Sequence, residues 1–129
     1  AVGDFEFSKK QLELLKDKVD IYSGNDNQTY DFVINGGVGV VSVASHVVGD
    51  EISEMISFAK DNDLEKAEEI NMQLSNLFEA IFEEPSPGPI KKILSESWEE
   101  VGEPLLPITS ITPELANKIR GFYKKIKEN

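Results

Sequence analysis

Two short apolar runs, each leading into a segment with helical periodicity, constrain this chain more than any other feature. The first is Val19–Ser23, which ends in the polar loop Gly24–Asn27. The second is Val38–Val43, which follows the glycine pair Gly36-Gly37 and is apolar almost throughout. A strand that is apolar at nearly every position is typical of a parallel sheet covered on both faces. Two consecutive strand–loop–helix units therefore predict an α/β protein, in which functional residues lie on the loops that leave the strands.

Helical periodicity fills most of the remaining chain, and capping residues set the expected boundaries. Ser8 can cap the first helix, and Asn25 or Asp26 can cap the second. The last helix has the clearest start, because Thr112 is a good cap and Pro113 suits the first helical position. The expected helices cover residues 7–18, 25–34, 50–60, 64–82, 89–97 and 113–127.

Two parallel strands do not form a stable sheet by themselves. Both outer edges would carry unpaired backbone groups, and both faces of these strands are apolar. We therefore expect the fold to need more strands than this sequence supplies. On this argument the chain is a fragment, or one half of a split protein.

Charge and residue usage narrow the classes of partner. With 24 acidic against 13 basic side chains the formal net charge is −11, which disfavours nucleic acid and anionic membrane surfaces as partners. The chain has no cysteine, so disulfides and thiol nucleophiles are excluded. No apolar run approaches the ~20 residues that span a bilayer, and the start Ala1–Asp4 lacks the features of a secretory signal. We therefore expect a soluble, cytoplasmic protein.

The glycine run Gly36–Gly39 admits two interpretations. A phosphate-binding loop needs its glycines between a strand and a helix, followed by Lys and then Ser or Thr. Here the glycines precede the strand and no lysine follows, so a structural turn is favoured. The loop Gly24–Asn27 lies at the exit of its strand, where Gly24 lets the backbone approach a ligand. Helix capping and ligand contact both stay open for the polar residues of this loop.

The other chemistry-bearing residues predict no further site. His46 is the only histidine and has no evident partner, so capping or surface exposure is favoured over proton transfer. The acidic pairs Glu68-Glu69 and Glu99-Glu100 indicate solvated helix faces, and no metal site is predicted. The lysines fall on polar faces or helix ends rather than on strands, so none is predicted to be a Schiff-base nucleophile.

The order and spacing of four motifs resemble the C-terminal part of the dihydrodipicolinate synthase family. These motifs are Tyr22–Asp26, Gly36–Val43, Glu84–Lys91 and Pro104–Ile108. The family includes N-acetylneuraminate lyase and 2-keto-3-deoxy-sugar-acid aldolases, which are class I aldolases on a TIM (β/α)8 barrel with a C-terminal helical extension. The resemblance implies that residues 1–62 are the end of the barrel, with its last two strands, and that residues 63–129 are the helical extension.

The same resemblance implies an activity whose chemical groups lie outside this chain. In the family, pyruvate forms a Schiff base with a lysine, and the resulting enamine adds to an aldehyde such as aspartate semialdehyde in lysine biosynthesis. That lysine, the tyrosines of the proton relay and the threonines that bind the pyruvate carboxylate all belong to the missing N-terminal barrel half. The resemblance therefore implies no catalytic residue in this chain, no cofactor, no activity for the chain alone, and a homo-oligomer for the intact enzyme.

The family's substrate-binding residues that match positions in this chain all belong to one wall of the substrate pocket. Gly24 matches a glycine whose backbone lies beside the pyruvate, and Val41 matches an apolar residue whose carbonyl faces the Schiff base. Asn25 and Asp26 match a polar pair that faces the second substrate. These four are the predicted substrate-binding residues, and none is predicted to bind metal.

Some positions depart from the family pattern and keep alternatives open. His46 replaces an asparagine that is usual in the synthases, and Gly88 replaces an isoleucine in the proline motif. The lyase branch typically has an acidic residue at the position of Asn27 and a serine at that of Val43, so this chain favours the synthase branch. The alternatives are a sugar-acid aldolase or N-acetylneuraminate lyase, or a non-catalytic assembly module that needs a separate N-terminal half.

Overall fold

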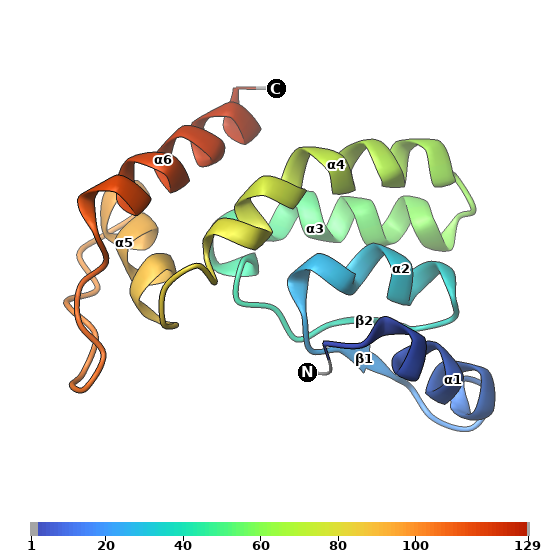
Figure 1. The fold of residues 1–129 in the computed structure, drawn as a ribbon. Coiled ribbons are helices and arrows are strands. Elements are labelled where there is room, and N and C mark those ends of the chain that lie inside the picture. The colour runs from blue at the N-terminus through green and yellow to red at the C-terminus, as the bar shows by residue number, and fades with distance from the viewer. Residues whose placement is uncertain (1–2, 129) are drawn as a thin grey trace. The chain divides into compact units, whose positions relative to one another are not determined.

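The computed structural model describes residues 3–128, which fold into two compact units (Figure 1). Of the described residues, the first unit takes in 3–43 and 50–72, and the second takes in 44–49 and 73–128. Ala1 and Val2, on which part of the prediction about a secretory signal rests, lie outside the described residues.

The first unit contains a two-stranded parallel sheet with a helical crossover. Strand β1 (Tyr22–Ser23) pairs with β2 (Gly39–Val40) in the register Tyr22 to Gly39 and Ser23 to Val40. The connection between them is the 3-10 turn η1 (Asp26–Gln28) and helix α2 (Thr29–Ile34), which lies beside the strands in Figure 1. The predicted strand–loop–helix order is confirmed here. The strands are shorter than expected because only these residues form ladder pairs.

Helix α1 (Phe5–Leu15) begins earlier than its periodicity predicted, because a different residue caps it. The Asp4 carboxylate accepts a hydrogen bond from the Glu6 N–H at 3.0 Å. Ser8, the predicted cap, lies inside the helix and is buried. The prediction for the next helix was also wrong in detail, since Asn25 precedes η1 without a side-chain capping bond.

Helices α3 (Ser45–Lys60) and α4 (Leu64–Ala80) each contribute to both units. Helix α3 begins before the predicted Asp50 and has a non-helical residue, Val48, near its start. The break between the helices falls at Asp61–Asp63, as predicted, and Asn62 has a φ of 62°. Buried side chains of α2, α3 and α4 form the core of the first unit: Val33, Met55, Ala59 and Ala67.

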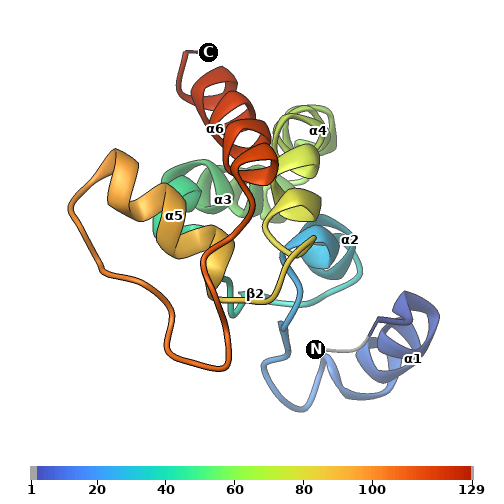
Figure 2. The same ribbon diagram turned by 60° about the vertical axis from the view of Figure 1, so that its left-hand side comes forward.

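The second unit pairs helix α5 (Gly88–Ser97) with helix α6 (Pro113–Lys127), which a long irregular segment connects (Figure 2). The predicted start of α6 is confirmed, because the Thr112 hydroxyl accepts a hydrogen bond from the Leu115 N–H at 3.4 Å. The Glu84 carboxylate in turn accepts the Thr112 N–H at 3.1 Å. The buried apolar side chains of this unit include Leu74, Leu77, Phe78, Ile81, Ile90, Ile93, Leu115 and Ile119.

The described residues are mostly helical, and their strand content is the one two-stranded sheet. No helix among residues 3–128 is both long and apolar enough to cross a membrane. The predicted boundary between barrel and extension at residues 62 and 63 stays a prediction. The compact units divide the chain elsewhere because the two central helices belong partly to each unit.

Candidate functional site: the exits of the paired strands

The two strands of the first unit end at the same edge of their sheet. Because β1 and β2 are parallel and paired, the loop after Ser23 and the segment after Val40 leave from neighbouring positions. At the end of this pairing, the Val41 N–H donates to the Ser23 carbonyl at 2.8 Å. The edge from which parallel strands leave is where α/β proteins place their ligands. The predicted residues of both exits therefore do come together.

Asp26 joins these two exits through its side chain. It is buried, with 2% of its surface exposed. One carboxylate oxygen accepts the hydroxyl of Ser42, and the other accepts the backbone N–H of Val43 at 3.1 Å. Hydrogen bonds to an ionised acceptor are among the stronger ones in proteins. The Asp26 carboxylate therefore points at the exit of β2.

The loop after β1 is held by its own hydrogen bonds. The Ser23 hydroxyl donates to the Asn25 carbonyl at 2.9 Å and accepts the Asn25 N–H at 3.1 Å. The Thr29 hydroxyl also donates to the Asn25 carbonyl, at 3.3 Å. Ser23 and Thr29 are both buried. These contacts fix the backbone between the strand and the first turn of the crossover.

The predicted site residues differ in exposure. Gly24 is exposed, and Val41 is 74% exposed. Asn25 is half-buried, and its amide donates to the Gln28 side chain at 3.3 Å. Asp26 is the member of the set that is shielded from solvent. Which of the four contacts a substrate stays a prediction.

The glycine run before β2 forms a structural turn, as the sequence favoured. Gly36 has a φ of +102°, which L side chains rarely adopt. A Cβ on Gly37 would lie 2.4 Å from Cδ1 of Phe32 and 2.9 Å from the Phe32 carbonyl oxygen. The backbone N–H groups of both glycines donate to carbonyls of α2. This turn ends α2 and lets the chain enter β2 close against Phe32.

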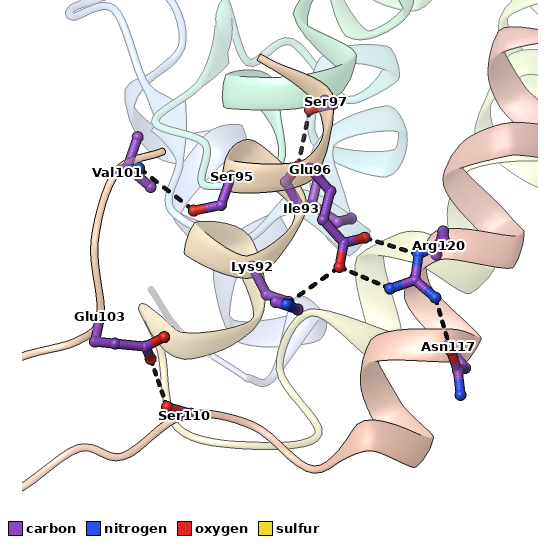
Figure 3. A network of polar contacts seen from close by, with 10 residues as sticks. All are labelled: Lys92, Ile93, Ser95, Glu96, Ser97, Val101, Glu103, Ser110, Asn117 and Arg120. Carbon is purple, nitrogen blue, oxygen red and sulfur yellow. Dashed lines mark hydrogen bonds and ion pairs between the residues drawn. The ribbon is translucent and has the colours of Figure 1, made fainter. Parts of the chain in front are cut away.

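The second unit has a cleft that was not predicted from the sequence, and Figure 3 shows the polar contacts that lie along it. The cleft, of about 490 Å³, lies between α5, α6 and the segment that connects them. Arg120 contacts both oxygens of Glu96, with Nε–Oε2 and Nη2–Oε1 distances of 2.8 and 2.7 Å. Lys92 approaches the same carboxylate at 3.2 Å, and Arg120 also donates to Asn117. Arg120 and Lys92 hold the pKa of Glu96 below its usual range, and Glu96 raises the pKa of Arg120.

Other polar groups of this cleft hold the connecting segment in place. The Lys91 ammonium donates to the Glu103 carbonyl at 2.9 Å, and the Ser110 hydroxyl donates to the Glu103 carboxylate. The Ser95 hydroxyl accepts the Val101 N–H at 3.3 Å. A Cβ on Gly88 would lie 3.0 Å from Cγ2 of Ile111 in the same segment. Because these polar groups bind one another, we interpret them as holding the connecting segment against α5 rather than as a ligand site.

Comparison with known proteins identifies the family. Residues 1–126 match the family model described as the Dihydrodipicolinate synthetase family. This chain belongs to that family. The match falls on the C-terminal part of the family, as the sequence motifs implied.

Relatives and solved structures agree with this assignment. The chain is 32% identical over 126 residues to the 4-hydroxy-tetrahydrodipicolinate synthase of Listeria monocytogenes serotype 4a, and this covers 98% of the chain and 43% of the relative. It is 45% identical over 100 residues to the synthase of Thermosynechococcus vestitus, covering 78% of the chain and 34% of the relative. The dihydrodipicolinate synthase of Thermotoga maritima superposes with a TM-score of 0.93 at 28% identity, covering 98% of this chain and 44% of that one.

The chain thus spans about two fifths of the length of the synthases it matches. Within residues 3–128, no group of three or more His, Asp or Glu side chains is arranged to hold a metal ion. His46 lies exposed in the first turn of α3, as predicted.

Proposed function

We propose that this chain forms the C-terminal portion of a Schiff-base-forming, pyruvate-dependent aldolase. The reaction that fits best is that of 4-hydroxy-tetrahydrodipicolinate synthase, in which pyruvate and aspartate semialdehyde combine in lysine biosynthesis. One observation carries the proposal: residues 1–126 match the dihydrodipicolinate synthase family. The relatives that support it are synthases by name.

The proposed chemistry begins on a lysine that lies outside these 129 residues. Its amine adds to the ketone of pyruvate and releases water, which gives the Schiff base. Loss of a methyl proton forms the enamine, whose carbon then bonds to the aldehyde carbon as the C=O π bond breaks and its oxygen takes up a proton. This restores an iminium, and attack on that carbon by water or by the amine of the product frees the lysine. No residue of this chain exchanges a proton or forms a bond in this scheme.

In this proposal the chain supplies one wall of the pocket. The backbone at Gly24 and the carbonyl of Val41 would lie beside the pyruvate-derived atoms. Asn25, which is half-buried at the mouth of the loop, would meet the aldehyde substrate. Asp26 follows Asn25 and is buried.

The remaining strands of the barrel would come from residues outside this sequence. Each strand of the described sheet pairs on one edge only, because the sheet has just β1 and β2. Tyr22 in β1 and Val41 just after β2 are large apolar residues that are exposed. Pairing with further strands would satisfy the free backbone groups and cover this apolar surface.

Reductive trapping tests the proposal. The chain is incubated with pyruvate and borohydride, once alone and once assembled with the missing barrel half, and each polypeptide is weighed by mass spectrometry. We expect an adduct only in the assembled protein, on a lysine outside this chain. An adduct on the isolated chain would contradict the proposed location of the nucleophile.

A second candidate is a non-catalytic assembly module, which the one-sided pairing of both strands also favours. The same experiment separates the two functions. An assembly that forms with defined stoichiometry but never traps pyruvate supports the module. Among active assemblies, comparison of aspartate semialdehyde with sugar-derived aldehydes separates the synthase from the sugar-acid aldolase and neuraminate lyase branches.

A further inference from the structure

Both carboxylate oxygens of Asp26 accept hydrogen bonds from the residues that follow β2. The donors include the Ser42 hydroxyl and the Val43 N–H, on consecutive residues after β2. Asp26 is 2% exposed, and a buried carboxylate is costly unless donors surround it. The geometry meets that requirement from within the chain. The Asp26 carboxylate is therefore shielded from solvent, whereas a substrate would arrive from the solvent side.

Val41 lies between two anchors as a consequence. Its N–H donates to the Ser23 carbonyl at 2.8 Å, which fixes the peptide on its N-terminal side. Its own carbonyl belongs to the peptide that leads into Ser42, whose side chain Asp26 holds. The direction of the Val41 carbonyl is therefore set from both sides, and Asp26 is the anchor on the far side.

Asp26 can act as an anchor because its own backbone is held. It begins η1, in which the Gln28 N–H donates to the Asn25 carbonyl at 3.2 Å. The buried hydroxyls of Ser23 and Thr29 bind that same carbonyl. The Asp26 side chain can fix the position of the β2 exit because hydrogen bonds hold both its backbone and its carboxylate.

We infer that Asp26 is a positioning residue. Its carboxylate accepts hydrogen bonds from Ser42 and Val43, a pair of contacts called here the Asp26 clasp, and so aligns the Val41 carbonyl. Asn25 is then the loop side chain that contacts the aldehyde. This inference rests on the proposed function. It separates two adjacent residues that the family resemblance treats as a pair. It also predicts opposite kinetic effects for them.

The test uses substitutions in the assembled enzyme, with kcat and the KM of each substrate measured separately. Asp26→Ala removes the clasp, and Ser42→Ala removes the donor to one oxygen. For Asp26→Ala we expect kcat to fall by about 10- to 100-fold, because small displacements of groups beside reacting atoms have effects of that size. We expect a smaller fall for Ser42→Ala, and an unchanged aldehyde KM in both. Asn25→Ala should instead raise the aldehyde KM.

The conservative variant Asp26→Asn distinguishes positioning from charge chemistry. An asparagine can accept the Val43 N–H with its oxygen and donate to the Ser42 oxygen with its amide, so it can rebuild the clasp without the charge. We expect Asp26→Asn to retain most of the activity and the pH profile. An Asp26→Asn enzyme as impaired as Asp26→Ala, or with a raised aldehyde KM, would overturn the inference. Asp31→Ala, on an exposed residue of α2 outside this loop, is the control.

Hydrogen exchange at the Val43 amide tests the clasp without any activity. We expect faster exchange in Asp26→Ala than in the parent protein and near-parent exchange in Asp26→Asn. Equal protection in all three proteins would contradict the clasp. A parent protein that protects this amide but forms no pyruvate adduct would instead overturn the proposed function, so the two failures can be told apart.

Discussion

Gly37 stands at a position with no room for a side chain. A Cβ there would meet both the ring and the carbonyl oxygen of Phe32, whose side chain is buried. The Gly37 N–H also donates to that carbonyl at 2.9 Å, so the backbone cannot simply move away. At the scale of the single residue, this contact fixes how the chain passes from α2 into β2.

The first prediction concerns this contact. We expect Gly37→Ala to destabilise the protein by about 1–3 kcal/mol, the usual range for forcing atoms into a packed site. Gly121→Ala is the matched control, because Gly121 lies within α6 with no atom near its Cβ position. Alanine there should stabilise the helix by about 0.5–1 kcal/mol. Urea unfolding measures both changes, and equal effects would contradict the packing argument.

At the scale of secondary-structure elements, α5 and α6 are joined by an ion pair. Arg120 forms a two-point contact with Glu96, and Lys92 adds a third cation–carboxylate contact one turn earlier on α5 (Figure 3). The side chains are partly exposed, at 40% for Arg120 and 29% for Glu96. Solvent screening at such exposure limits what the pair can contribute.

The pH dependence of stability follows from the lowered pKa of Glu96. Its cause is first the hydrogen bond from Arg120, with burial opposing it and Lys92 adding to it. Because the pKa in the folded protein lies below the ordinary value of 4.5, the contribution is present above that value. It is lost as the pH falls through the folded pKa. We therefore expect part of the stability of the α5–α6 pair to disappear on acidification below about pH 4.5.

Glu96→Gln checks this second prediction. At neutral pH the variant should be less stable by about 1 kcal/mol or less, as for other partly exposed pairs. Its unfolding midpoint should also change less than that of the parent protein on acidification. Glu99→Gln, on an exposed residue just beyond α5, is the control. A parallel pH dependence in the parent and in Glu96→Gln would refute the role given to the ion pair.

The elements that could be predicted from the sequence are those with local signals. The start of α6 was predicted correctly because Thr112 and Pro113 are adjacent cap and first-turn residues. The start of α1 was wrong because Asp4 and Ser8 are both good caps, and only the fold shows which one precedes the helix. Helix α3 was predicted to begin too late, because Gly49 and the non-helical Val48 interrupt its periodicity.

The contacts between the two strand exits could not be predicted from local sequence patterns, because they join residues far apart in the chain. The sequence placed Gly24, Asn25, Asp26 and Val41 at strand exits, and the pairing of β1 with β2 brings these exits together. The bonds from Asp26 to Ser42 and Val43 cross 16 and 17 residues, and no spacing rule predicts them. The contact between Arg120 and Glu96 crosses 24 residues. Of the two cations that contact Glu96, only Lys92 had a signal in the sequence, because the two residues are an i, i+4 pair.

At the scale of the whole molecule, the chain holds about two fifths of the synthase fold. Its sheet has one pair of strands, and a parallel sheet in the α/β class needs more. For this chain we propose a homo-oligomer of assembled barrels.

Light scattering at several protein concentrations checks this third prediction. By itself the chain should associate as concentration rises, because its strand edges and apolar side chains have no cover. Mixed with the missing barrel half, it should form one complex of fixed stoichiometry. A well-folded chain that stays monomeric as its concentration rises, and that forms no complex with the missing half, would contradict both the assembly and the proposed function.

The pairing of β1 with β2 also bears on how the protein folds. The Asp26 clasp closes a loop of only 16 or 17 residues, and the register of the two strands closes one of similar length. The entropy lost in closing a loop grows only with the logarithm of its length, so short closures come first. We expect the segment from β1 to β2 to form early and to serve as a template. The site edge would then exist before the pocket that it borders.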